Sequence, residues 1–187
     1  MFSVIFPGQG SQSIGMTKEL YDNFTYIKDL FKQADDELGY SISKIILEGP
    51  KEDLDLTENT QPAIFLASYS IFEMIKKEKD IKLENAKYFA GHSLGEYSAL
   101  ATSGSLDFKN AIKLLNERGK AMQTAVPKGT GGMVAVLGTD IKEINSLLEE
   151  NQNNYKCYIA NDNSNGQIVL SGLNSDFDKF IDTLKSK

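Results

Sequence analysis

Residues 91–95 read Gly-His-Ser-Leu-Gly, a G-x-S-x-G pentapeptide between a short apolar run and a segment of helix-forming composition. A motif that fixes only three positions occurs often by chance, so the flanking segments decide how strongly it indicates a functional serine. A strand, a sharp turn and a helix in this order predict an elbow that holds Ser93 strained and exposed at a helix N-terminus. The glycines would permit close backbone approach, and the Leu94 amide would face an oxyanion formed on an acyl-Ser93. The alternative is a serine that simply N-caps its helix.

Composition excludes several classes of function. With 187 residues and 41% apolar residues, the chain can form one core or a core plus a small satellite. A formal charge of -6 without a long basic run argues against nucleic acid and anionic membranes as partners. The single cysteine, Cys157, excludes an internal disulfide, and its place in a predicted strand without a histidine or basic cluster beside it indicates an inert buried thiol. The amino-terminal segment lacks a signal-like pattern and breaks at Pro7, so we expect a cytoplasmic protein.

Hydrophobic spacing predicts an α/β fold for residues 1–126. Residues 2–6 form an apolar run that stops at a glycine-rich loop, which is typical of a buried strand. Further helices follow from three- and four-residue spacing. They are a helix at residues 21–38 that stops at Gly39, a helix that starts near Thr60 with Pro62 in its first turn, and a helix capped by Asp107.

Arg118 lies on the last of these helices, in a predicted stripe with Leu114, Leu115 and Met122. This spacing directs the guanidinium inward, where an unpaired cation is costly. A bound carboxylate held by two parallel hydrogen bonds would satisfy it, and so would a salt bridge to an internal Asp or Glu. The sequence does not decide between a bound carboxylate and an internal Asp or Glu as the partner of Arg118.

Two other polar residues lie close to the predicted strand ends. Gln9 follows the first strand, and open α/β sheets collect ligand groups at the carboxyl ends of their strands. It is a candidate second oxyanion donor, and the alternative is that it only holds the loop together. His92 is the single histidine. Because neighbouring side chains diverge at a sharp turn, we expect His92 to shape the site and not to act as the base for Ser93.

A glycine-rich stretch after Val126 predicts a boundary between a domain at 1–126 and a smaller one at 127–187. The smaller part has the order β-α-β-β-α of a ferredoxin-like α+β unit that lacks its last strand. Asn161 and Asn163 precede Gly166 in a predicted turn, where they face solvent or contact substrate. The expected strands are residues 133–137, 155–159 and 168–170, and the expected helices are 141–148 and 177–184.

Four segments are more specific together than alone: Phe6-Pro7-Gly8-Gln9-Gly10-Ser11-Gln12, Thr60-Gln61-Pro62-Ala63, Gly91-His92-Ser93-Leu94-Gly95-Glu96-Tyr97-Ser98-Ala99-Leu100 and Arg118-Gly119-Lys120-Ala121-Met122-Gln123. In order and spacing they resemble the malonyl-CoA:acyl-carrier-protein transacylases of bacterial-type fatty acid synthesis. The resemblance runs from residue 2 to the end of the chain. It implies an α/β-hydrolase-like large domain with a nucleophile elbow.

The resemblance also implies a reaction. Ser93 would take malonyl from coenzyme A as an ester and pass it to the phosphopantetheine thiol of acyl carrier protein, with no cofactor consumed. Gln9 and the Leu94 amide would stabilise the oxyanion, and Arg118 would pair with the malonyl carboxylate. The residues expected to line the substrate pocket are Gln61, His92, Met122, Asn161 and Asn163. A monomer is expected.

Members of this family continue beyond the point that corresponds to residue 187, and no residue here matches their catalytic histidine. We therefore expect the chain alone to be impaired or inactive. Three interpretations follow: a truncated transacylase, a catalytically silent module that binds acyl carrier protein, and a serine esterase on the same elbow. A surface patch of Lys109, Lys113, Lys120 and Lys128 is the predicted docking site for the acidic carrier protein.

Overall fold

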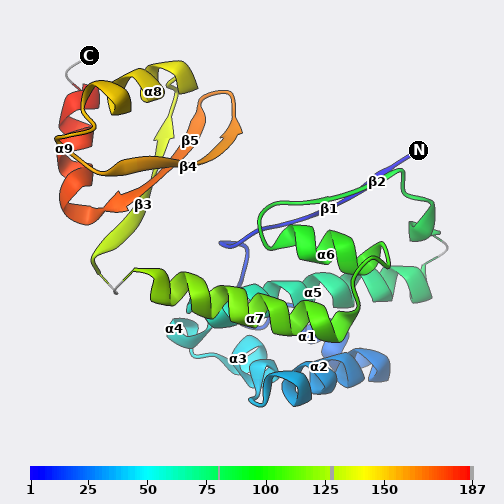
Figure 1. The fold of residues 1–187 in the computed structure, drawn as a ribbon. Coiled ribbons are helices and arrows are strands. Elements are labelled where there is room, and N and C mark those ends of the chain that lie inside the picture. The colour runs from blue at the N-terminus through cyan, green and yellow to red at the C-terminus, as the bar shows by residue number, and fades with distance from the viewer. Residues whose placement is uncertain (80, 127–128, 186–187) are drawn as a thin grey trace. The chain divides into compact units, whose positions relative to one another are not determined.

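A computed structural model describes residues 1–79, 81–126 and 129–185. The chain divides into two compact units, Met1–Gln123 and Thr124–Lys187 (Figure 1). Each unit has its own hydrophobic core, so each is described by itself. No helix in the described ranges combines the length and apolar character that crossing a bilayer requires.

The large unit contains a two-stranded parallel sheet. Strand β1 (Ser3–Phe6) pairs with β2 (Tyr88–Gly91), and Phe6 lies opposite Gly91. Strand β1 begins one residue after the start of the predicted strand at residues 2–6, and β2 lies in the apolar run expected before the pentapeptide. Because the strands are parallel and in this register, their carboxyl ends stop side by side. The loop after β1 and the elbow after β2 therefore start from the same edge of the sheet.

Helices make up most of the large unit (Figure 1). They are α1 (Lys18–Asn23), α2 (Thr25–Leu38), α3 (Ile42–Glu48), α4 (Lys51–Leu54), α5 (Thr57–Glu78), the 3₁₀ turn η1 (Leu83–Asn85), α6 (Gly95–Thr102) and α7 (Phe108–Ala125). The Asp107 cap is confirmed, since its Oδ1 accepts from the Asn110 backbone N–H at 3.0 Å. The predicted stop at Gly39 is also confirmed by its left-handed φ of 74°.

Two helix predictions need correction. The single helix expected at residues 21–38 is two helices, because Phe24 is extended (φ -123°, ψ 116°) and its N–H closes α1 on Leu20. Hydrophobic spacing runs through this break, because residues on both sides pack on the same core. Helix α5 begins at Thr57, so Pro62 lies inside the helix and not in its first turn. Helices α3 and α4 have no counterpart in the sequence prediction.

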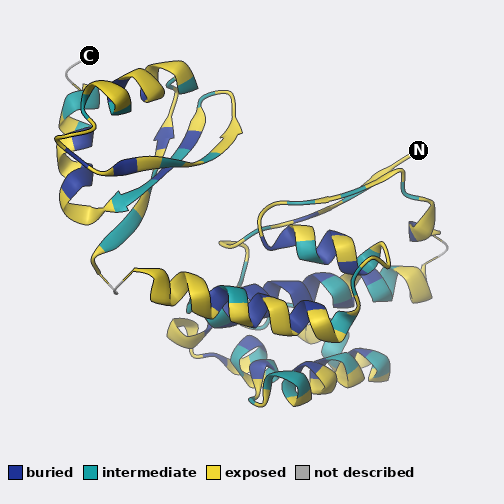
Figure 2. Cartoon of the chain, viewed as in Figure 1, coloured by how far each residue is buried: buried dark blue, intermediate teal, exposed yellow. Residues whose placement is uncertain are grey.

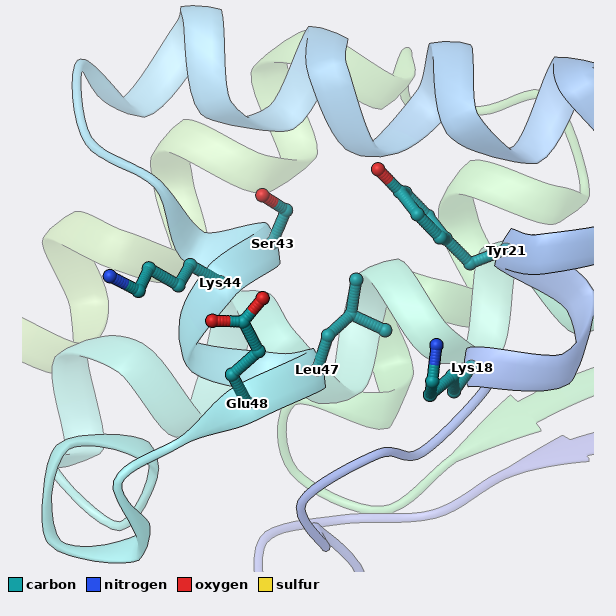
Figure 3. A pocket seen from close by; sticks show the side chains of 6 residues that line it. All are labelled: Lys18, Tyr21, Ser43, Lys44, Leu47 and Glu48. Atoms are coloured by element: carbon teal, nitrogen blue, oxygen red, sulfur yellow. The ribbon is translucent and has the colours of Figure 1, made fainter.

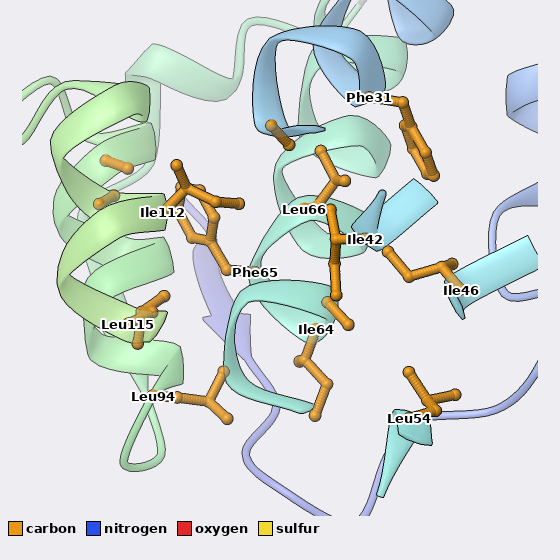
Figure 4. Packing of buried hydrophobic residues seen from close by; sticks show 14 of the residues in the cluster. Phe31, Ile42, Ile46, Leu54, Ile64, Phe65, Leu66, Leu94, Ile112 and Leu115 are labelled. Carbon is orange, nitrogen blue, oxygen red and sulfur yellow. The ribbon is translucent and has the colours of Figure 1, made fainter. Parts of the chain in front are cut away.

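The core of the large unit gathers side chains from α2 to α7 (Figures 2 and 4). Its fully buried members include Phe31, Phe65 and Ile112, and Leu94 of the elbow belongs to the same cluster. Burial of each such side chain contributes about 1.5–3 kcal/mol relative to exposure. The residue next to Ser93 is therefore anchored in the core.

The predicted apolar stripe on α7 is wrong in two members. Leu114 is 44% exposed and Met122 is 47% exposed, while Arg118 is half-buried. The buried stripe consists of Ala111, Ile112, Leu115, Asn116 and Gly119. A polar residue and a glycine occupy two of its five places, so a search for apolar residues alone misplaces the face by part of a turn.

The small unit has the predicted β-α-β-β-α order. Its elements are β3 (Gly131–Leu137), α8 (Ile141–Glu150), β4 (Cys157–Ser164), β5 (Gln167–Leu173) and α9 (Asn174–Lys185). The sheet order is β3-β5-β4, and both pairings are antiparallel. Cys157 is buried in this core, and burial is the main cause that raises the pKa of its thiol.

The turn predicted at residues 161–165 is wrong. Asn161 and Asn163 lie within β4, and the turn is confined to residues 165–166, where Gly166 has a φ of 80°. The pairing of β4 with β5 shifts register between Ile159 and Asn161 and again between Asp162 and Ser164. These irregularities accommodate asparagines, which are otherwise more common in turns, within a strand.

An ion-pair cluster joins α2 to α7. The Glu37 carboxylate accepts from Lys109 at 2.8 Å and from Lys113 at 2.6 Å, and these hydrogen bonds lower the pKa of Glu37 to about 2. Two of the four lysines in the predicted carrier-docking patch therefore face a carboxylate. Lys128, the last member of that patch, lies outside the described residues.

Glu37→Gln is expected to lower the melting temperature at neutral pH, because it removes the charge that both lysines face. The folded state lowers the Glu37 pKa from 4.5 to about 2, so the stabilisation is complete above the ordinary value and is lost as the pH falls toward 2. The difference in Tm between the chain and the variant should shrink over this range. Thermal unfolding followed by circular dichroism checks this, with exposed Asp29→Asn on α2 as the matched control. An equal effect of both substitutions would contradict the assignment.

Candidate active site

The site begins at the elbow between β2 and α6. Ser93 is one of two non-glycine residues with positive φ in the described chain, at 54°, and its side chain is exposed. This left-handed conformation costs roughly 1–3 kcal/mol for a residue with a Cβ. The turn is closed by the Gly95 N–H, which donates to the His92 carbonyl at 2.9 Å, and by the Glu96 N–H, which donates to the Ser93 carbonyl at 3.1 Å. The predicted strained, exposed serine is what the structure contains.

Both glycines of the pentapeptide lie so close to neighbouring backbone that a residue with a side chain would not fit. A Cβ on Gly91 would lie 1.9 Å from the carbonyl carbon of Gly95. A Cβ on Gly95 would lie 2.7 Å from the backbone oxygens of Phe6 and Pro7. The start of α6 therefore packs directly against the end of β2 at Gly91. It also packs against the end of β1 at Gly95. No side chain fits at either position without moving backbone.

The predicted oxyanion donors lie at the start of α6 and in the loop after β1. The side chain of Leu94 is fully buried, and no backbone hydrogen bond among the described residues uses its N–H. The side chain of Gln9 is exposed and its Nε2 donates to Thr57 Oγ1 at 3.5 Å. This long hydrogen bond connects the loop to the first residue of α5. The role of Gln9 as an oxyanion donor stays a prediction.

Arg118 reaches the hydroxyl of Ser93. Its Nη2 donates to Ser93 Oγ at 3.0 Å, and its Nη1 donates to Gln61 Oε1 at 2.6 Å. Its Cζ also lies 6.0 Å from the centre of the Tyr97 ring. Within the described ranges Arg118 forms no salt bridge with Asp or Glu, so the internal ion pair considered as an alternative is not observed. The guanidinium is aimed at the hydroxyl from a neighbouring helix.

Gln61 links Arg118 to the next residue of the predicted pocket. It is fully buried on α5, and its Nε2 donates to Met122 Sδ at 3.2 Å while its Oε1 accepts from Arg118. Ser93, Arg118, Gln61 and Met122 therefore form one connected group. Tyr97, in the first turn of α6, was not among the predicted site residues.

His92 is turned toward the β1 loop. A Cβ on Gly8 would lie 2.7 Å from His92 Nδ1, and the His92 backbone N–H donates to the Phe6 carbonyl at 3.2 Å. The imidazole thus lies against the loop that also carries Gln9. Whether His92 shapes the site, as expected from the sequence, stays a prediction.

Asn161 and Asn163 lie on β4 of the small unit, where Asn161 is half-buried and Asn163 is exposed. They belong to a different unit from Ser93, and their contact with substrate stays a prediction. A pocket of about 570 Å³ on the large unit is lined by side chains of α1 and α3 (Figure 3). Its lining residues include none of the predicted site residues, and its polar groups, such as Lys18 and Glu48, present both charge signs.

Comparison with known proteins gives a consistent result. Residues 3–187 match the family described as "Acyl transferase domain". Over 171 residues the chain is 45% identical to malonyl CoA-acyl carrier protein transacylase of Haemophilus influenzae, covering 91% of this chain and 54% of that protein. The corresponding values for the protein of the same name from Bacillus subtilis are 46% identity over 171 residues, with coverage of 90% and 52%. The chain therefore spans about half the length of these curated relatives.

The structure also resembles a solved complex of a type II PKS acyl-carrier protein with its malonyl-transacylase. The TM-score is 0.89 at 39% sequence identity, and the match covers 99% of this chain and 59% of the solved one. The chain accordingly has a mixed α/β acyltransferase fold.

Ser93→Gly is expected to raise the free energy of unfolding by roughly 0.5–1 kcal/mol relative to Ser93→Ala, because glycine adopts the left-handed conformation without strain. Both variants lose the Arg118 hydrogen bond, so their difference isolates the backbone. Urea denaturation measures it. The same two substitutions at Ser98, within α6, should give the opposite sign, because a helix interior favours alanine. Equal stability of the Ser93 variants would contradict a strained elbow.

Proposed function

Because the chain belongs to the acyl transferase domain family, we propose that it carries the nucleophile of a malonyl-CoA:acyl-carrier-protein transacylase. The hydrogen bond of 3.0 Å from Arg118 Nη2 to Ser93 Oγ is the observation that carries this proposal. A nucleophile beside a guanidinium suits an acyl group with a second, anionic end. Malonyl is such a group. The relatives' names support the same donor and the same carrier.

The proposed reaction proceeds in two transfers. Ser93 Oγ attacks the thioester carbonyl of malonyl-CoA while a base takes the hydroxyl proton, and collapse of the tetrahedral intermediate releases coenzyme A as a thiol once it is protonated. The phosphopantetheine thiol of acyl carrier protein then attacks the Ser93 ester, and the hydroxyl is restored. In both steps the negative charge on the carbonyl oxygen would be stabilised by the Leu94 N–H and by Gln9. No redox cofactor is needed for this exchange.

Selectivity would come from Arg118. In the unloaded site its two terminal nitrogens donate to Ser93 and Gln61. A malonyl carboxylate would replace the hydroxyl as acceptor and form charged hydrogen bonds with the guanidinium fork. An acetyl group offers no such acceptor, so a site built around this arginine disfavours it. Met122, which contacts Gln61, would line the same pocket.

The general base is proposed to lie outside residues 1–187. His92 is the single histidine of the chain, and its Nδ1 lies beside Gly8. A base must reach the Ser93 hydroxyl from another segment. The curated relatives are nearly twice as long as the stretch that matches this chain. The isolated chain is therefore expected to react slowly with substrate.

Finer features of the fold are part of the same proposal. The parallel sheet and the elbow support an α/β-hydrolase-like large domain at residues 1–126. For the small domain at 127–187, the antiparallel order β3-β5-β4 supports a ferredoxin-like subdomain whose further strand would pair with β3. Docking of an acyl carrier protein is supported by the solved complex that this chain resembles.

Incubation with malonyl-CoA is expected to add one malonyl group to the chain, on Ser93, and imidazole in the buffer should accelerate the addition because it can serve as the base. Intact-mass and peptide mass spectrometry measure the adduct. Ser93→Ala should abolish it, and imidazole should accelerate the addition to His92→Ala by about the same factor as in the unaltered chain, because His92 is not the base. An adduct on another residue would contradict the proposal. Hydrolysis of simple esters without transfer to a thiol would instead favour an esterase.

Arg118→Ala is expected to reduce the preference for malonyl-CoA over acetyl-CoA by about 10- to 100-fold, since the hydrogen bonds to a charged acceptor are lost. Arg118→Lys should retain part of the preference, because it keeps the charge without the planar fork. Competition between the two thioesters, read by mass spectrometry, gives the ratio directly. An unchanged ratio in Arg118→Ala would remove the carboxylate assignment.

A further inference from the structure

Helix α5 contains a proline where a backbone donor is normally required. Pro62 lies inside the helix and has no N–H to donate to the carbonyl four residues earlier, that of Glu58. The proline ring also pushes this carbonyl away from the helix axis. A buried carbonyl without a donor would cost about 1–3 kcal/mol. The Glu58 carbonyl therefore needs a partner from another element.

Asn116 of α7 supplies that donor. Its Nδ2 donates to the Glu58 carbonyl at 3.0 Å and to Tyr40 Oη at 3.0 Å, and the residue is 5% exposed. The Tyr40 hydroxyl in turn donates to Asn59 Oδ1 at 2.9 Å. Burial, aided by the charges of Glu58 and Asp35, raises the pKa of Tyr40 to about 12, so the phenol remains a donor at neutral pH. The amide of Asn116 is thus held by two acceptors, the Glu58 carbonyl of the helix backbone and the Tyr40 hydroxyl, which is itself bonded to Asn59.

The backbones of α5 and α7 meet at the same point. A Cβ on Gly119 would lie 2.5 Å from Glu58 Cα and 2.6 Å from the Thr57 carbonyl oxygen. Only a glycine permits this approach. Gly119 and Asn116 lie three residues apart on α7, so both face the first turn of α5. The crossing is consequently held both by close contact and by a hydrogen bond.

The residue that carries the guanidinium and one of the residues that accept hydrogen bonds from it are immediate neighbours of this crossing. Gln61 precedes Pro62 on α5, and Arg118 precedes Gly119 on α7. The Arg118 Nη1 to Gln61 Oε1 hydrogen bond of 2.6 Å runs between the two helices. A displacement of α7 on α5 would therefore move Arg118 relative to Ser93. Misplacement of a reacting group by about 1 Å can cost about 100-fold in rate.

We propose that Asn116, through the Glu58 carbonyl that Pro62 leaves without a helical donor, is a positioning residue that fixes Arg118 against Ser93. The inference concerns the selectivity of the proposed transacylase and rests on that function. Among the described residues, the hydrogen bonds of the Asn116 side chain go to Tyr40 and to the Glu58 carbonyl, and neither joins it to the Ser93 hydroxyl or to the guanidinium. It acts through the placement of the helix that carries Arg118.

Arg118 is the only arginine of the chain, so ¹⁵N-arginine labelling of residues 1–187 reports on one guanidinium. Because Nη1 and Nη2 have different acceptors, two separate Nη resonances are expected at low temperature. Asn116→Ala should merge them into one averaged resonance. Retention of both resonances at unchanged shifts in Asn116→Ala would overturn the proposal, as would a single averaged resonance in the unaltered chain.

Pro62→Ala provides a second variant that keeps the helix intact. It returns an N–H to residue 62, which can draw the Glu58 carbonyl back into the helix and away from Asn116. We expect an unchanged or higher Tm together with partial merging of the Nη resonances. Ile27→Val, a core substitution on α2, is the matched control, because it should lower the Tm without merging them. Merging in the control, or none in Pro62→Ala, would contradict a positioning role.

Selectivity provides the functional measurement. Asn116→Ala should reduce malonyl addition to Ser93 about tenfold while leaving acetyl addition nearly unchanged, whereas Ile27→Val should affect both alike. Equal loss of both additions in Asn116→Ala would overturn the positioning role. If the unaltered chain takes no malonyl even with imidazole as the added base, the proposed function fails, and the Nη resonances still decide whether Asn116 positions the arginine.

Discussion

The backbone conformation of Ser93 is the constraint on which the rest of the site depends. A left-handed residue between β2 and α6 turns the chain sharply enough to present the hydroxyl to solvent. The turn exists because Gly91 and Gly95 let the start of α6 press against the ends of both strands. On the other side, Leu94 anchors the elbow in the core. The strain is thus held by packing, as expected for a functional site in which surrounding contacts over-determine the backbone.

The second constraint lies at the crossing of α5 and α7. An internal proline, a buried asparagine and a glycine are each unfavourable in an isolated helix. Here Pro62 leaves the Glu58 carbonyl without a helical donor, and Asn116 donates a hydrogen bond to it. Gly119 lets α7 approach α5 closely. Each of these unfavourable residues makes a contact that offsets the cost of another. In the proposed account, these contacts together hold Arg118 in place beside Ser93. Residues that break local rules together are those that build the site.

Sequence patterns predicted the elements with strong hydrophobic spacing and the elbow, because glycine positions and a strand-to-helix transition are local features. They misplaced the α7 face and the start of α5, since both depend on Asn116 and Pro62, whose places are set by contacts between helices. The break at Phe24 was missed because hydrophobic spacing runs through it, and the strand placement of Asn161 was missed because asparagine is more common in turns. Ser93 and Arg118 were chosen from the sequence, whereas the hydrogen bonds among Arg118, Gln61 and Met122 required the structure.

The most direct test of this account is a crystal structure of the chain after reaction with malonyl-CoA. The account predicts an ester on Ser93 Oγ whose free carboxylate lies about 2.7–2.9 Å from the terminal nitrogens of Arg118. A malonyl group whose carboxylate points to solvent, with Arg118 still bonded to Gln61 alone, would contradict it. So would malonyl attached to any residue other than Ser93.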